Sequence, residues 1–169
     1  PTLIAVLSDL NSNEIMLWTS IIIGVFVLPN IFLVLYMKRK GKHTYQRGSR
    51  TPIYLLGFIT LFICLFLLAV LEGPRILWMC IIALIVWIPL QLFINQLFTK
   101  VSTHMAVVSG CGVALYMLNK LNHPLLMLAM VAIILFTAWA RIKTKNHSLQ
   151  QVILGIMSGG GTVILVFSA

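Results

Sequence analysis

Long apolar stretches separated by short polar segments make up most of this chain. A helix needs about 20 mainly apolar residues to cross the hydrocarbon core of a membrane. Six stretches fit this requirement closely enough to predict spanning helices: residues 14–36, 53–71, 76–98, 104–118, 124–140 and 149–168. The breaks between them are rich in Gly, Pro, Asn and basic residues, which end helices. The pattern predicts an all-α fold, a bundle of about six transmembrane helices forming a single domain over residues 1–169.

Residues 1–13 stand apart from these spans. The chain begins at Pro1, and the apolar segment after it is too short to cross a membrane. It lacks the basic, apolar and small-residue regions of a signal peptide. We expect it to be the end of a truncated helix, a processed end or an interfacial segment.

Several details inside the spans predict how the helices pack. Pro29 and Pro89 should kink their helices. The fourth span is short and rich in small residues, which allow close helix approach, so we expect it to pack against neighbours. The spacing Gly155-x3-Gly159 predicts a close-packing face. Polar residues at membrane depth should face the bundle interior; they are Asn30, Gln91, Asn95 and Gln96.

The composition agrees with a membrane protein. Hydrophobic residues make up 60% of the chain and charged residues only 9%, with a mean hydropathy of +1.05. A soluble domain has about 25% charged residues. The net charge of +9 does not indicate nucleic-acid binding, because no aromatic-laced basic surface or soluble domain accompanies it. The three cysteines lie in apolar runs without CxxC spacing, so we expect packing rather than a disulfide or a metal site.

Basic residues are concentrated in alternate loops. The loops at 38–52, 100–104 and 141–147 fall on one side of the membrane and carry most of the Lys and Arg, whereas the other side carries only Arg75 and Lys120. Positively charged loops are typically cytoplasmic. We therefore expect an integral protein of a bacterial cytoplasmic membrane, with the basic face inside and in contact with anionic lipid headgroups.

The residues best suited to chemistry lie on the same side. Arg141, His147 and Gln151 stand at short spacing before the last apolar run, while Ser102 and His104 follow the third span. A neutral imidazole can attack phosphorus, and a planar guanidinium binds phosphate oxygens through two parallel hydrogen bonds. At a membrane edge, such a phosphate would belong to a lipid.

These residues resemble known signatures. Arg141, five residues, His147, three residues and Gln151 resemble the third signature of the type 2 phosphatidic acid phosphatase superfamily, whose last position is Asp. The run from Ser102 to His104 resembles the second signature, a Ser-x-His. Arg50-Thr51-Pro52 is similar to a degenerate form of the first. The resemblance covers roughly residues 40–161.

The resemblance implies a role for each matched residue. His147 would be the nucleophile that forms a phosphohistidine, and His104 would protonate the leaving alcohol. Gln151 would replace the Asp that orients the nucleophile. Arg141, Arg50 and Ser102 would bind the phosphate. The implied activity is a lipid phosphatase that hydrolyses a phosphomonoester or diphosphate on a phospholipid or polyprenyl lipid, and no metal or organic cofactor is implied.

Other hypotheses stay open beside this one. A catalytically silent relative could serve as a structural or lipid-binding subunit of a larger membrane complex or a homo-oligomer, and Gln151 in place of Asp favours this. A small lipid or solute carrier is disfavoured, because a transport site is expected near the midplane. Taken singly, His147 could be a helix-start residue with Asn146 as cap, and His104 a turn histidine. Arg141 could snorkel to the interface, and Arg50 could be a solvated topological charge.

Overall fold

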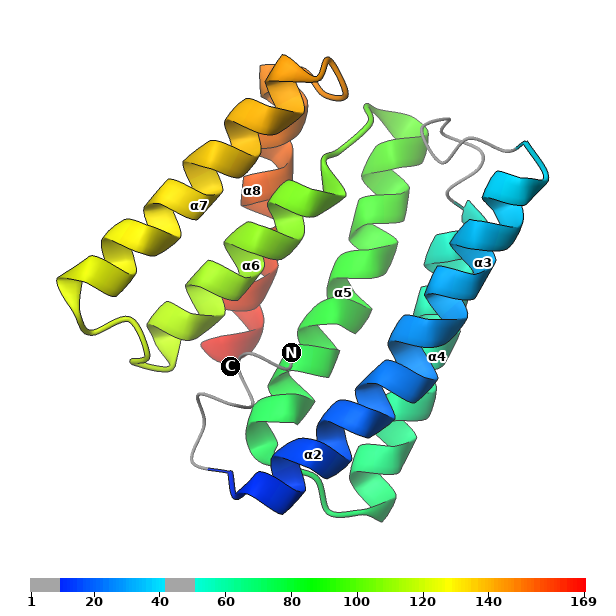
Figure 1. Cartoon of the computed structure of the whole chain (residues 1–169), viewed down its shortest axis with the longest axis vertical. Helices are drawn as coiled ribbons and strands as arrows, with labels where there is room; N and C mark the ends of the chain where they lie inside the picture. The colour runs from blue at the N-terminus through cyan, green and yellow to red at the C-terminus, as the bar shows by residue number, and fades with distance from the viewer. Residues whose placement is uncertain (1–9, 42–50) are drawn as a thin grey trace. The chain divides into compact units, whose positions relative to one another are not determined.

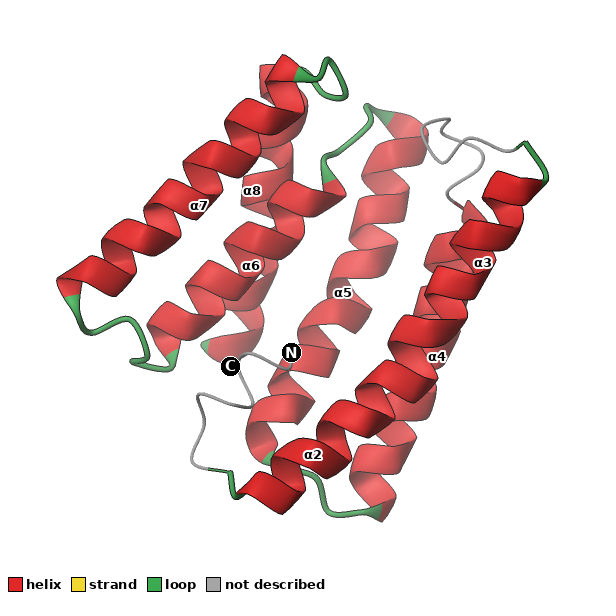
Figure 2. Ribbon diagram, in the orientation of Figure 1, coloured by secondary structure: helices red, strands yellow, loops and turns green. Residues whose placement is uncertain are grey.

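The computed structural model describes residues 10–41 and 51–169, and all regular structure within these ranges is helical (Figures 1 and 2). Each predicted span is found as a helix whose ends lie within three residues of the prediction. The elements are α2 (Ser12–Ile21), the π-helix η1 (Ile22–Val27), α3 (Leu28–Arg39), α4 (Thr51–Val70), α5 (Arg75–Leu97), α6 (Thr103–Met117), α7 (Pro124–Lys143) and α8 (Leu149–Phe167).

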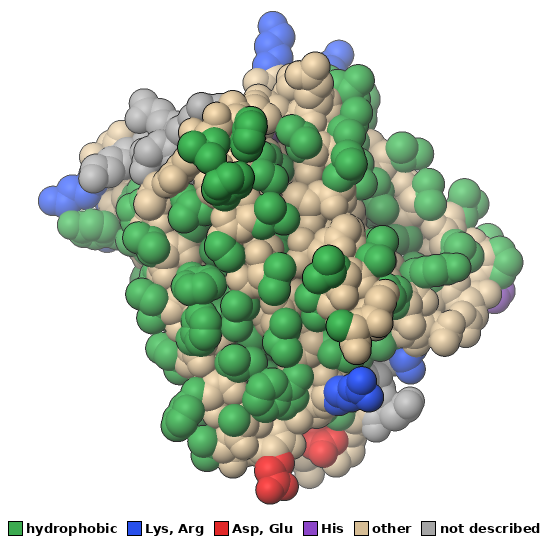
Figure 3. Space-filling view, turned by 180° about the vertical axis from the view of Figure 1, so that it is seen from behind, with side chains coloured by type: hydrophobic (Ala, Val, Ile, Leu, Met, Phe, Trp, Pro, Cys, Tyr) green, Lys and Arg blue, Asp and Glu red, His purple; other side chains and the backbone are tan. Residues whose placement is uncertain are grey.

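Length and composition identify five of these helices as able to cross a membrane. The continuous segment α2–η1–α3 counts as one such helix of 28 residues, and α4, α5, α7 and α8 are the others, while α6 is shorter. The surface is largely apolar, and charged side chains are few (Figure 3). The prediction of an all-α membrane protein is therefore confirmed. The helices group into two compact units, Pro1–Leu92 and Phe93–Ala169, and the boundary falls within α5.

In the first unit, the first span is not a regular α-helix. It widens into η1, where the N–H of Leu28 donates to the carbonyl of Ile23, five residues back. Pro29 follows directly and has no N–H to donate to the preceding turn. The side-chain amide of Asn30 donates to the carbonyl of Phe26 at 2.7 Å. A π-helix thus stands just before Pro29, whereas the helix that contains Pro89 continues through it.

The second unit is built around the contact between α6 and α8. A Cβ atom on Gly155 would lie 2.6 Å from the carbonyl oxygen of Ser102, and one on Gly159 would overlap the backbone of Ala106. The hydroxyl of Ser109 donates across the contact to the carbonyl of Ile156 at 3.2 Å. The predicted close-packing face at Gly155 and Gly159 is confirmed, and so is the packing of the short fourth span against a neighbour.

The remaining parts of this unit show where lipid would lie. No residue of α7 is buried, so its apolar side chains are available to lipid.

Asn95 is buried, with 5% of its surface exposed, but the next residue, Gln96, is exposed. The prediction that Gln96 faces inward was wrong, because successive residues of a helix point about 100° apart. Gln91, in the first unit, is fully buried as predicted.

Replacement of Gly159 with Ala should destabilise the protein by about 1–3 kcal/mol, because the added methyl group forces α6 and α8 apart. Gly161→Ala is the matched control, two residues further along α8, where nothing lies within 4 Å of the added Cβ. This control should be neutral or stabilise by up to about 1 kcal/mol. Thermal unfolding in detergent measures both, and equal stability of the two variants would contradict the packing described above.

Candidate functional site

The start of α8 is fixed by a reciprocal pair of hydrogen bonds. Ser148 is the N-cap, and its hydroxyl accepts from the N–H of Gln151 at 3.4 Å. The side-chain oxygen Oε1 of Gln151 accepts from the N–H of Ser148 at 3.3 Å. This is a capping box, which satisfies two N–H groups at the helix end. The cap is therefore Ser148 and not Asn146, and His147 lies immediately outside the helix.

The ring of His147 lies against Gln151. Its Nδ1 is 3.2 Å from Oε1 of Gln151. Because Oε1 also accepts from the N–H of Ser148, the atom that faces His147 is the amide oxygen, which can only accept. Nδ1 must then carry the proton of the neutral ring, and Nε2 keeps its lone pair. This is the tautomer that an Nε2 nucleophile requires.

The linker between α5 and α6 is held onto the same helix start. The side-chain amide of Gln151 donates to the hydroxyl of Thr99 at 3.3 Å, and the carbonyl of Gln151 accepts from the N–H of Ser102 at 3.2 Å. The N–H of Val101 donates to Oδ1 of Asn95 at 2.8 Å. Val101 and Ser102 are fully buried. The segment that carries Ser102 and the segment that carries His147 and Gln151 are therefore in direct contact.

Ser102 occupies the N-cap position of α6, but its side chain makes no capping hydrogen bond. Its hydroxyl is buried and has no hydrogen-bond partner among the residues that the structure describes. His104 is the second residue of this helix and its side chain is exposed. The N-terminus of a helix favours anions; His104 is exposed there, whereas Ser102 has none of its surface exposed.

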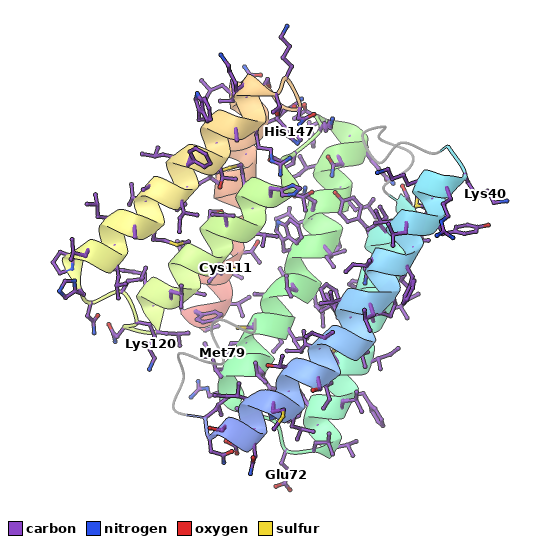
Figure 4. The ribbon with its side chains drawn as sticks, in the orientation of Figure 1. Lys40, Glu72, Met79, Cys111, Lys120 and His147 are labelled. Carbon is purple, nitrogen blue, oxygen red and sulfur yellow. The ribbon has the colours of Figure 1, made fainter. Side chains whose placement is uncertain are left out.

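Arg141 lies in the last turn of α7 and is half-buried. Its carbonyl accepts from the N–H of His147 at 3.3 Å, which closes the loop between α7 and α8. Figure 4 shows His147 at this end of α8. Arg50, the remaining residue expected to bind phosphate, lies outside the described residues.

All charged side chains of the second unit are basic. Residues 93–169 contain no Asp or Glu, and four of their basic residues lie at the end that bears His147: Lys100, Arg141, Lys143 and Lys145. A surface of one sign raises the local concentration of ligands of the opposite sign. In the described part of the chain, no three His, Cys, Asp or Glu residues are grouped as metal ligands would be. The four cations at this end can therefore raise the local concentration of an anionic ligand.

The sequence analysis did not identify three residues of the site: Ser148, Thr99 and Lys100. The pattern Ser148-x2-Gln151 is a capping-box signature that could have been recognised. Thr99 and Lys100 carry no such signal, because their partners lie 52 and 46 residues away along the chain.

Removal of the Ser102 hydroxyl should not destabilise the free protein. A buried hydroxyl without a partner costs about 1–3 kcal/mol, so Ser102→Ala should leave the free energy of unfolding unchanged or raise it. Ser109→Ala, on the same helix, should instead lower it by about 1 kcal/mol, because that hydroxyl donates across to α8. Unfolding in detergent compares the two, and an equal loss in both would contradict the assignment of Ser102.

Comparison of the chain with protein-family models, with curated proteins and with solved structures found no match.

Proposed function

We propose that this protein is a membrane lipid phosphatase, which hydrolyses a phosphomonoester or diphosphate on a lipid through a phosphohistidine at His147. The observation that carries the proposal is the contact between Nδ1 of His147 and Oε1 of Gln151. With the proton on Nδ1, Nε2 carries the lone pair that would attack phosphorus. We also propose that the protein lies in a bacterial cytoplasmic membrane, with the site on the basic side, which faces the cytoplasm.

The reaction would take place in two displacement steps. Nε2 of His147 forms a bond to phosphorus while the bond from phosphorus to the lipid oxygen breaks, and His104 gives a proton to that oxygen. A water molecule then loses a proton to His104 and attacks the phosphohistidine, which releases inorganic phosphate and restores His147. Proton transfer by a positioned imidazole typically contributes a factor of about 100 to 10,000.

Charge and location support a phosphorylated lipid as the substrate. Arg141 lies in the last turn of α7, and its backbone carbonyl accepts from the N–H of His147. Cations that face a transferring phosphoryl group stabilise the charge that it develops. The same unit contains α7 and α8, both long and apolar enough to cross a membrane. A lipid headgroup at the membrane surface would therefore reach the site while its chains stay among lipids.

His147→Ala should reduce phosphate release by at least about 1,000-fold, because loss of a nucleophile removes the covalent route. His123→Asn is the control, since His123 lies at the start of α7 and accepts from the N–H of Leu125, a capping role that Asn can fill. Purified protein in mixed micelles is assayed with phosphatidate, phosphatidylglycerol phosphate and a polyprenyl diphosphate. Equal rates for wild type and His147→Ala would sink the nucleophile assignment.

Gln151 favours a second function, that of a catalytically silent, lipid-binding subunit of a membrane complex. The amide oxygen orients His147 but carries no charge. A carboxylate at this position would stabilise the imidazolium that forms during catalysis, and loss of such a charge is very costly in serine proteases. A site with Gln151 would therefore bind phosphate with a smaller catalytic advantage.

Gln151→Glu separates these two functions. Glu keeps the reach of Gln, and its carboxylate can accept from His147, from the N–H of Ser148 and from the hydroxyl of Thr99. We expect the rate of phosphate release to rise about tenfold or more. Gln150→Glu adds the same charge on an exposed neighbour and should change the rate less than about twofold.

The rate of phosphate release by the wild type decides between the two functions. Measurable phosphate release by the wild type supports the enzyme. Release that appears only in Gln151→Glu supports the silent relative. Equal gains in both Glu variants would show that orientation of His147 by residue 151 does not limit the rate.

A further inference from the structure

The side-chain amide of Gln151 has two ends of opposite chemistry, and its orientation decides which end faces His147. In the observed orientation Oε1 accepts from the N–H of Ser148 at 3.3 Å, and Nε2 donates to the hydroxyl of Thr99 at 3.3 Å. An amide turned by half a rotation would place its NH2 group against the N–H of Ser148, so that two donors would face each other. It would also present a donor to Nδ1 of His147 and so favour the tautomer with the proton on Nε2.

Ser148 alone restrains this amide only weakly. The residue is exposed, so water can satisfy its N–H group when the bond to Oε1 of Gln151 is lost. Thr99 and Gln151 are both half-buried, and their contact joins segments 52 residues apart along the chain. The hydroxyl of Thr99 therefore supplies a second restraint, which acts on the nitrogen end of the amide and comes from outside α8.

The position of Thr99 is set by the end of α5. The N–H of Thr99 donates to the carbonyl of Ile94 at 3.1 Å. Two residues further on, the N–H of Val101 donates to Oδ1 of the buried Asn95 at 2.8 Å. Both acceptors belong to α5, so this helix fixes the backbone from which the Thr99 hydroxyl meets Gln151.

We propose that Thr99 is a positioning residue of this site, which holds the amide of Gln151 with Oε1 toward His147 and thereby keeps the proton of the neutral imidazole on Nδ1. Thr99 lies outside the residues matched to the signatures and acts through Gln151. Its effect on catalysis rests on the proposed phosphatase function, since Nε2 of His147 is the atom that would attack phosphorus. Its effect on the tautomer is a property of the protein without substrate.

Thr99→Val removes the hydroxyl and keeps the shape of the side chain. Loss of one neutral hydrogen bond changes an equilibrium about fivefold, so the ratio of the Nε2–H to the Nδ1–H tautomer of His147 should rise by that factor. The kcat for a phosphorylated lipid should fall by up to about fivefold, because only the Nδ1–H form is competent. Thr99→Ala removes the same acceptor and should give the same shift.

Thr99→Ser retains the hydroxyl and should stay within about twofold of the wild type in both the tautomer ratio and kcat. Thr137→Val is the matched control. The hydroxyl of Thr137 donates within α7, to the carbonyl of Ile133, so its loss should leave both quantities unchanged.

15N NMR of the full chain in detergent, with labelled histidine and at a pH where the rings are neutral, gives the tautomer from the separate signals of Nδ1 and Nε2. His147→Ala identifies the signals of His147. An unchanged tautomer in Thr99→Val and Thr99→Ala would overturn the role of Thr99, whether or not the protein releases phosphate. An equal shift in Thr99→Ser, with lower unfolding temperatures in all three variants, would assign Thr99 to packing of the linker and overturn the role of its hydroxyl. A wild type that has the Nδ1–H form, responds to Thr99→Val and releases no phosphate would overturn the phosphatase and support the positioning role of Thr99.

Discussion

The close contact between α6 and α8 is the constraint on which the candidate site depends. Gly155 and Gly159 have no side chains, so the start of α8 can approach the backbone of Ser102 and Ala106. At that separation the N–H of Ser102 donates to the carbonyl of Gln151, and the linker before α6 lies on the first turn of α8. Without a hydrophobic driving force between helices in lipid, small residues and polar contacts of this kind hold the helices together. A larger side chain at either glycine would separate the segment of Ser102 from the segment of His147 and Gln151.

Gln151 then organises what the helix contact brings together. Its oxygen faces His147 and the N–H of Ser148, while its NH2 group donates to the hydroxyl of Thr99. An amide has both donor and acceptor atoms, whereas a carboxylate only accepts. Gln151 can thus orient the imidazole and hold the α5–α6 linker at once. The resembled signature has Asp where this chain has Gln151. In this structure Gln151 is the residue that contacts both His147 and the α5–α6 linker.

The sequence predicted the helices well, because apolar length and polar breaks are local properties. It also predicted the contact at Gly155 and Gly159, since the backbone can approach closely only where side chains are small. The π-helix before Pro29 was not foreseen, because a proline predicts disruption but not its form. Within the site, the pairing of His147 with Gln151 follows from their spacing of four residues. The contacts of Thr99 and Lys100 depend on how distant segments meet, which no local pattern specifies.

The electrostatics of the site relate its two proposed functions. With no Asp or Glu in residues 93–169, the cations near His147 are not neutralised by any carboxylate side chain of this unit. That favours capture of a phosphate dianion, because the attraction is not shared with a competing carboxylate. Formation of the phosphohistidine places a positive charge on the imidazole ring, which Gln151 contacts only through a neutral oxygen. Replacement of Asp by Gln would therefore strengthen binding of the phosphate and slow its transfer. An enzyme and a lipid-binding relative could therefore share one fold and differ only in the charge of the residue at position 151.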